Sequence, residues 1–180
     1  EFEEEDLVID EDFIAECNKG DTVGISYSKQ CPILNYLTLG VPLGEMFMVG
    51  GHSGAGKSSF VFENMIIPMA EEGVDVAIIS NEMRSQDYKI MLLAHILTKN
   101  LNYWKMTRKQ IKMGHFSEEQ MDMLHKAMKI SKEKYSKIHF IKLFDNDVSK
   151  VLKYITKLSK RGVQVFLWDT MKSDDSMDEK

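Results

Sequence analysis

The sequence contains little cysteine, little proline and no long apolar run. Its two cysteines, Cys17 and Cys31, form neither a C-x-x-C pair nor a metal-binding spacing, which indicates reduced thiols. No stretch is apolar enough to span a membrane, and no secretory signal is recognisable. These absences argue against disulfide-rich secreted proteins and membrane-spanning proteins, and they favour a cytoplasmic protein.

A net positive charge is also lacking. The formal net charge of -5 gives no overall attraction to nucleic acid or to anionic membranes. Residues 1–16 hold nine acidic side chains and no basic one, whereas Lys and Arg dominate residues 99–161. The basic stretch could contact phosphate, but solvated helix faces explain it about as well. We expect an acidic tail or linker at residues 1–20 and one domain at residues 21–180.

One glycine-rich stretch carries most of the chemical information. Residues 51–58 fit G-x-x-x-x-G-K-[ST], the phosphate-binding P-loop. The glycines let backbone N–H groups converge on phosphate oxygens, Lys57 supplies a compact positive charge, and Ser58 offers a hydroxyl to Mg²⁺. We therefore expect ATP or another NTP, with Mg²⁺, at Gly51, His52, Ser53, Gly54, Ala55, Gly56, Lys57, Ser58 and Ser59.

The P-loop motif has the surroundings that its mechanism needs. Residues 45–49 form a short, mostly apolar run that predicts a buried strand. A helix is predicted from residue 57 to about residue 72, kinked or ended by Pro68, and its N-terminus would face the same anion. This order of strand, loop and helix makes a chance glycine-rich turn the weaker interpretation.

Strands and helices alternate along the rest of the chain. Apolar runs at 74–80, 138–143 and 163–168 predict three further strands. Helices are predicted between them, with Ser85, Thr107 and Ser117 as N-caps, a last helix over about 148–158, and short helices at 12–17 and 33–37. The alternation predicts right-handed crossovers and an α/β fold with a mainly parallel sheet.

Two carboxylates follow predicted strands and should therefore lie at one edge of the sheet. Asp169 ends an apolar run, where a Walker B aspartate would hold Mg²⁺ directly or through water. An aspartate there is more often a cap or a turn residue, but the P-loop motif upstream favours the metal role. Glu82 could polarise a water that attacks the γ-phosphate. Its spacing fits an exposed glutamate near a helix start equally well.

Several segments, in this order, resemble the RecA-like motor domain of DnaB-type replicative helicases. They are residues 39–45, the P-loop motif, the run Ile79-Ser80-Asn81-Glu82-Met83, residues 114–119, and the strand ending at Asp169. The resemblance covers roughly residues 22–172 and implies a RecA-like P-loop NTPase with a three-layer sandwich. It also implies a homo-hexameric ring that hydrolyses NTP while moving along single-stranded DNA during replication.

Residue roles follow from the resemblance. Lys57 would contact phosphates, Ser58 and Asp169 would serve Mg²⁺, and Glu82 would be the catalytic base. The sequence is similar to phage or virus members, which would place it in the host cytoplasm. In the family a sensor strand, DNA-binding loops and an arginine finger follow the Walker B strand. We therefore expect a motor domain that is incomplete at its C-terminus and has little ATPase activity alone.

Two alternatives stay open at this point. DnaB-type proteins usually have Asp-Tyr-Leu-Gln after the Walker B strand, whereas this chain has Asp169-Thr170-Met171-Lys172. A RecA-like recombinase or a clock-type ATPase is therefore one alternative, and a non-catalytic ATP-binding assembly module is the other.

Overall fold

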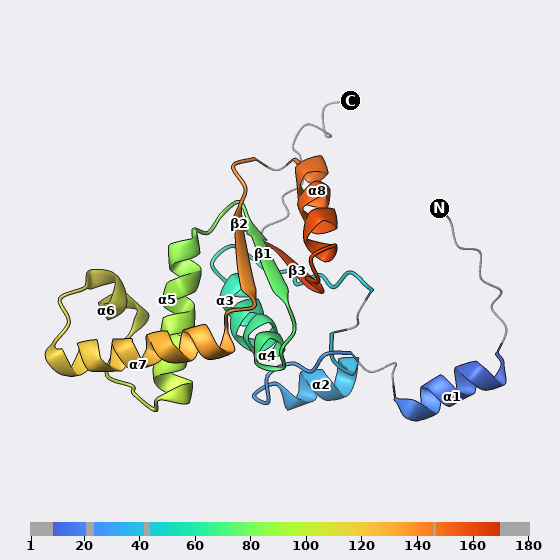
Figure 1. The fold of residues 1–180 in the computed structure, drawn as a ribbon, viewed down its shortest axis with the longest axis horizontal. Coiled ribbons are helices and arrows are strands. Elements are labelled where there is room, and N and C mark those ends of the chain that lie inside the picture. Colours follow the sequence, from blue (N-terminus) through green and yellow to red (C-terminus); the bar gives the residue numbers. More distant parts are fainter. Residues whose placement is uncertain (1–8, 21–23, 42–43, 146, 170–180) are drawn as a thin grey trace. The chain divides into compact units, whose positions relative to one another are not determined.

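The computed structural model describes residues 9–20, 24–41, 44–145 and 147–169, and Figure 1 shows its elements. The chain forms two compact units, Glu1–Met48 and Val49–Lys180. The boundary predicted near residue 20 stays a prediction, and residues 1–8 of the predicted tail lie outside the described ranges. Within those ranges, no helix has the length and apolar character needed to cross a bilayer.

The first unit contains the two short helices predicted in this part of the chain. α1 spans Glu11–Lys19 and α2 spans Pro32–Thr38, so each is slightly longer than expected. Gly40 follows α2 with a φ of 95°, and a Cβ at this position would lie 2.7 Å from the carbonyl oxygen of Gly24. Two backbone segments therefore approach so closely here that only glycine fits.

The second unit is built on a parallel sheet of three strands. β1 (Val76–Ser80) lies between β2 (Ile138–Lys142) and β3 (Val165–Asp169). All five residues of β1 are buried, as expected for a central strand of a parallel sheet with both faces covered. Three of the predicted strands are confirmed, and with them a mixed α/β fold with a parallel sheet.

Helices cover both faces of this sheet (Figure 1). On one face, Val151 of α8 (Val148–Ser159) packs against Ile79 and Leu143. Apolar side chains around this cluster are Ile141, Ile155, Phe166 and Trp168.

On the opposite face, Tyr88 of α5 (Ser85–His95) packs against two other aromatic rings. Its ring centroid lies 5.3 Å from that of Phe62 and 5.7 Å from that of Phe140 in β2. Successive residues of a strand point to opposite faces of the sheet. Ile79 of β1 therefore belongs to the face covered by α8, and Ile78 to the face covered by α5. The described part of the second unit therefore has three layers, helix, sheet and helix.

The helix after the P-loop motif continues past the proline that was expected to kink or end it. It runs through α3 (Lys57–Val61), the π turn η1 (Phe62–Ile66) and α4 (Ile67–Glu71). A proline lacks the backbone N–H and crowds the carbonyl four residues earlier. The wider π turn directly before Pro68 relieves this conflict, and the Ile67 N–H bonds to the Phe62 carbonyl.

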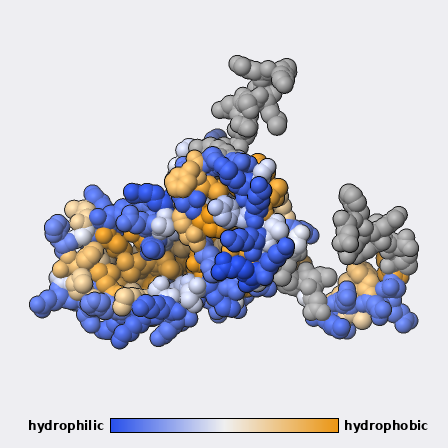
Figure 2. All heavy atoms as spheres, turned by 45° about the horizontal axis from the view of Figure 1, so that its top comes forward, coloured by the Kyte–Doolittle hydropathy of each residue, from blue (hydrophilic) through white to orange (hydrophobic). Residues whose placement is uncertain are grey.

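Two further helices and a second π turn form a lobe beside the sheet. η2 spans Ile96–Asn100, α6 spans Arg108–Met113, and α7 spans Glu118–Lys134. The predicted caps Thr107 and Ser117 are confirmed, each in a reciprocal capping box with a glutamine three residues on. Figure 2 shows apolar surface over this lobe, bordered by hydrophilic residues. Large exposed apolar side chains in this part of the chain include Trp104, Met113, Met121 and Met128.

Two local predictions are wrong. Ser85 is the first helical residue of α5 rather than its cap, and Arg84 occupies the N-cap position. Residues 46–50 carry no strand in the structure. A strand needs a hydrogen-bonded neighbour. In the described ranges the sheet has the strand order β2-β1-β3, and this run is not among its strands.

The core contact of α8 leads to a prediction about stability. Val151 is fully buried, whereas Val148 in the same helix is 50% exposed. Val151→Ala removes two buried methyl groups and leaves a small cavity, so we expect a loss of about 2 kcal/mol in the free energy of unfolding. Val148→Ala, the matched control, should change it by less than about 0.5 kcal/mol. Equal effects of both substitutions in urea denaturation would contradict the described packing of α8.

Candidate nucleotide site at the carboxyl edge of the sheet

Residues 51–56 form an exposed loop that leads directly into α3. Gly54 and Gly56 have φ values of 77° and 86°, the left-handed region that side chains disfavour. The Lys57 ammonium folds back over the loop and donates hydrogen bonds to the carbonyl oxygens of Gly51, at 2.7 Å, and His52, at 2.9 Å. The loop thus surrounds the Lys57 ammonium and keeps this positive charge at the start of α3.

Ser58 and Asp169 meet at the carboxyl edge of the sheet, although 111 residues separate them. The Ser58 hydroxyl donates a hydrogen bond of 2.8 Å to Oδ1 of Asp169. Asp169 is the last residue of β3 and only 8% of it is exposed. The structure therefore brings together the two residues that the sequence assigned to Mg²⁺.

A tyrosine side chain bonds to the other oxygen of the Asp169 carboxylate. The Tyr88 hydroxyl donates to Oδ2 of Asp169 at 2.6 Å. Burial raises the pKa of Tyr88, and the hydrogen bond and negative charge of Asp169, with the charge of Glu82, raise it further. Tyr88 therefore stays protonated and remains a donor to the aspartate. In the sequence, Tyr88 belongs to the apolar stripe of a helix, and only the packing of α5 on the sheet reveals this contact.

Glu82 lies two residues beyond β1, at the same edge of the sheet as Asp169. The neighbouring Asn81 donates its backbone N–H to the Asp169 carbonyl at 3.1 Å. Glu82 is exposed, and its charge acts on the buried Tyr88. The fold thus gathers the loop, the two Mg²⁺ candidates and the candidate base at one edge, as expected for ligand sites of parallel sheets.

The Ser59 side chain contacts residues of α5 and α6. Its hydroxyl accepts a hydrogen bond of 3.2 Å from Arg108 and lies 3.6 Å from the Met91 sulfur. Arg108 also bonds to Glu63 at 2.7 Å, and His95 lies 2.8 Å from the same carboxylate. This network fixes the helix after the loop against α5 and α6.

The same network changes the protonation of Glu63. Burial raises the pKa of its carboxyl group, but the hydrogen bond with His95 and the charges of His95 and Arg108 outweigh burial. The net result is a pKa below the usual range, so Glu63 remains ionised at neutral pH.

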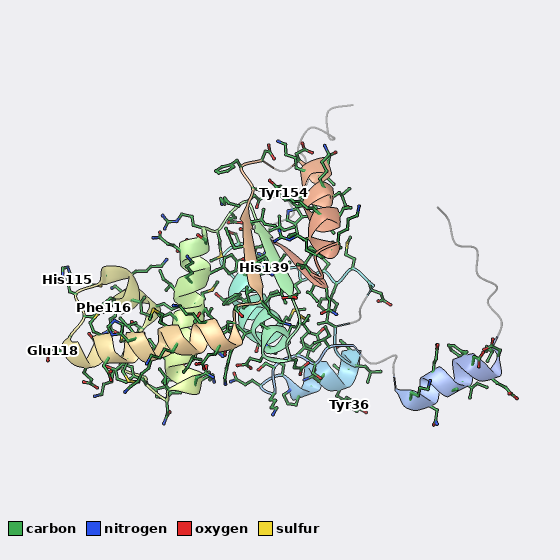
Figure 3. The ribbon with its side chains drawn as sticks, viewed as in Figure 1. Tyr36, His115, Phe116, Glu118, His139 and Tyr154 are labelled. Carbon is green, nitrogen blue, oxygen red and sulfur yellow. The ribbon has the colours of Figure 1, made fainter. Side chains whose placement is uncertain are left out.

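Among the described residues, no group of three or more His, Cys, Asp or Glu side chains could hold a metal ion. Figure 3 shows His115 in the loop between α6 and α7 and His139 on β2, well apart. A pair such as Ser58 and Asp169 suits Mg²⁺, because this ion keeps several waters and takes only one or two protein ligands beside phosphate oxygens. The residues present therefore fit nucleotide-bound Mg²⁺ better than an all-protein metal site.

These features define an α/β protein with a P-loop motif that faces an aspartate at the carboxyl end of a parallel strand. Comparison with protein families finds a match to the DnaB-like helicase C terminal domain over residues 28–173. The match spans most of the chain, and the protein therefore belongs to the DnaB-like helicase family. Residues 170–172, where the sequence departs from the family pattern, lie outside the described ranges. No curated protein matches the chain.

The contact between Tyr88 and Asp169 leads to a second prediction. Tyr88→Phe keeps the ring packing but removes a buried hydrogen bond to a carboxylate, so we expect a loss of about 1–3 kcal/mol in the free energy of unfolding. Tyr36→Phe is the matched control, because Tyr36 is 81% exposed on α2, and it should have no measurable effect. Denaturant titration of both variants measures the difference. A Tyr88→Phe protein as stable as the wild type would contradict the hydrogen bond.

Proposed function

We propose that the chain is the NTP-binding and NTP-hydrolysing motor domain of a replicative DNA helicase. Membership of the DnaB-like family supports a helicase motor, and the site geometry supports the nucleotide role. The observation that carries the proposal is the 2.8 Å hydrogen bond between Ser58 and Asp169, which joins the P-loop motif to the Walker B position. ATP or another NTP, accompanied by Mg²⁺, would bind at residues 51–59.

Each residue of the site has a role in this proposal. Lys57 would exchange the loop carbonyls for phosphate oxygens, because an ammonium with three donors suits both. Ser58 and Asp169 would hold Mg²⁺, and bound Mg²⁺ would neutralise charge on the phosphates. Tyr88 would keep the Asp169 carboxylate oriented. Glu82 would orient and deprotonate the attacking water as the catalytic base.

The proposal extends to partners. DnaB-family motors work as hexameric rings on single-stranded DNA, and we propose the same assembly and the same partner for this chain in the cytoplasm, with unwinding during replication as the outcome. Unwinding of a forked duplex would support this proposal. Filament formation on single strands without unwinding would instead favour a RecA-like recombinase.

Lys57→Ala provides the direct test of nucleotide binding. Loss of one charge-assisted hydrogen bond costs about 1.5–3 kcal/mol, so the affinity for ATP with Mg²⁺ should fall by roughly ten- to a hundredfold. Lys126→Ala is the control, because Lys126 lies on the surface of α7 and pairs with Asp122. Calorimetric titration measures both affinities. An unchanged affinity in the Lys57 variant would refute the assignment of the loop.

A further inference from the structure

We propose that Lys142 is a positioning residue that holds the turn carrying Glu82. The inference rests on the proposed function, because the turn matters for catalysis only if Glu82 is the base. Lys142 is the last residue of β2, and nothing in the sequence marked it as part of the site.

The three strands end in one row of polar side chains. In the register of the sheet, Ser80 of β1 lies opposite Lys142 of β2 on one side and opposite Asp169 of β3 on the other. Residues in register share a face of the sheet. Asp169 uses this face to bond Ser58 and Tyr88, so Lys142 belongs to the face on which the candidate nucleotide site lies.

Lys142 is half-buried and binds the turn rather than a carboxylate. Its ammonium donates hydrogen bonds to the backbone carbonyl of Asn81, at 2.9 Å, and to that of Met83, at 3.2 Å. These two carbonyls flank Glu82 in the sequence. One cation therefore clamps the backbone on both sides of the candidate base.

Ser80 completes the clamp from inside the turn. It is fully buried, and its hydroxyl accepts a hydrogen bond of 3.0 Å from the Met83 N–H. The Ser80 carbonyl accepts from the Leu143 N–H at 2.8 Å. The turn after β1 is thus tied to β2 through Lys142 and Leu143, and to β3 through the bond from Asn81 to Asp169.

A lysine suits this task for a physical reason. The carbonyls at a turn after a strand have no ladder partner, and a compact ammonium with three donors can satisfy two of them at once. Without the Lys142 ammonium, the turn would keep its hydrogen bond with Ser80 but lose its hydrogen bonds with the side chain from β2. A displacement of about 1 Å in a catalytic group can cost roughly a hundredfold in rate. The clamp therefore has a direct consequence for Glu82.

The test compares Lys142→Met with Lys137→Met in the full-length protein. Lys137 directly precedes β2 and makes a similar bond, from its ammonium to the Gly73 carbonyl at 2.7 Å, beside the opposite end of the strands. We expect Lys142→Met to lower kcat for NTP hydrolysis by ten- to a hundredfold, while the Kd for nucleotide changes by less than about twofold. Amide hydrogen exchange at Met83 should rise at least about tenfold. Lys137→Met should leave all three quantities unchanged.

Two further variants keep the test decisive. Lys142→Arg retains the donors and should recover most of the rate and of the Met83 protection. Ser80→Ala removes the other half of the clamp and should increase exchange at the same amide, which tests the turn independently if Lys142→Met does not fold.

The outcomes separate this inference from the proposed function. If the Met83 amide of Lys142→Met exchanges at the wild-type rate, Lys142 does not hold the turn. If nucleotide binding and turnover fall by equal factors, Lys142 binds nucleotide instead. Glu82→Gln should bind nucleotide normally and lose turnover, whereas the control Glu133→Gln should keep turnover, because Glu133 is exposed on α7. If Glu82→Gln keeps turnover, Glu82 is not the base and the proposed mechanism fails, while Met83 exchange still decides whether Lys142 holds the turn.

Discussion

The carboxylate of Asp169 is the group on which the site depends. It is almost buried, and a buried charge is stable only when its oxygens are satisfied. Ser58 from the P-loop motif and Tyr88 from α5 each bond one oxygen, so the strand, the loop and a covering helix are fixed to one another at a single point. The parallel sheet makes this possible, because it brings the carboxyl ends of β1 and β3 to the same edge.

Much of this arrangement could be predicted from the sequence, because the signals were local. The apolar runs of β1, β2 and β3 and the capping boxes at Thr107 and Ser117 depend on neighbouring residues alone. The P-loop motif and an aspartate at a strand end were enough to anticipate that Ser58 and Asp169 would lie together, because parallel strands share a ligand edge.

The missed features depend on contacts between distant segments. Tyr88 and Lys142 look like a core aromatic residue and a strand-end charge, and only the register and the packing of α5 reveal their bonds to Asp169 and to the Glu82 turn. The strand expected before the P-loop motif failed for a related reason, since apolar composition does not supply a pairing partner. Periodicity also does not reveal the π turn beside Pro68, which accommodates the proline ring.

The central claim is that the P-loop motif and Asp169 bind Mg²⁺ and nucleotide jointly. Its most direct test is calorimetric titration of ATP, with and without Mg²⁺, into the wild type and into Asp169→Asn. In the wild type, Mg²⁺ should tighten ATP binding by about tenfold or more, because it links the phosphates to Ser58 and Asp169. Asp169→Asn should still bind ATP through the loop but lose most of this enhancement. An Asp169→Asn protein with the full Mg²⁺ enhancement, or a wild type that binds no ATP, would contradict the proposed site.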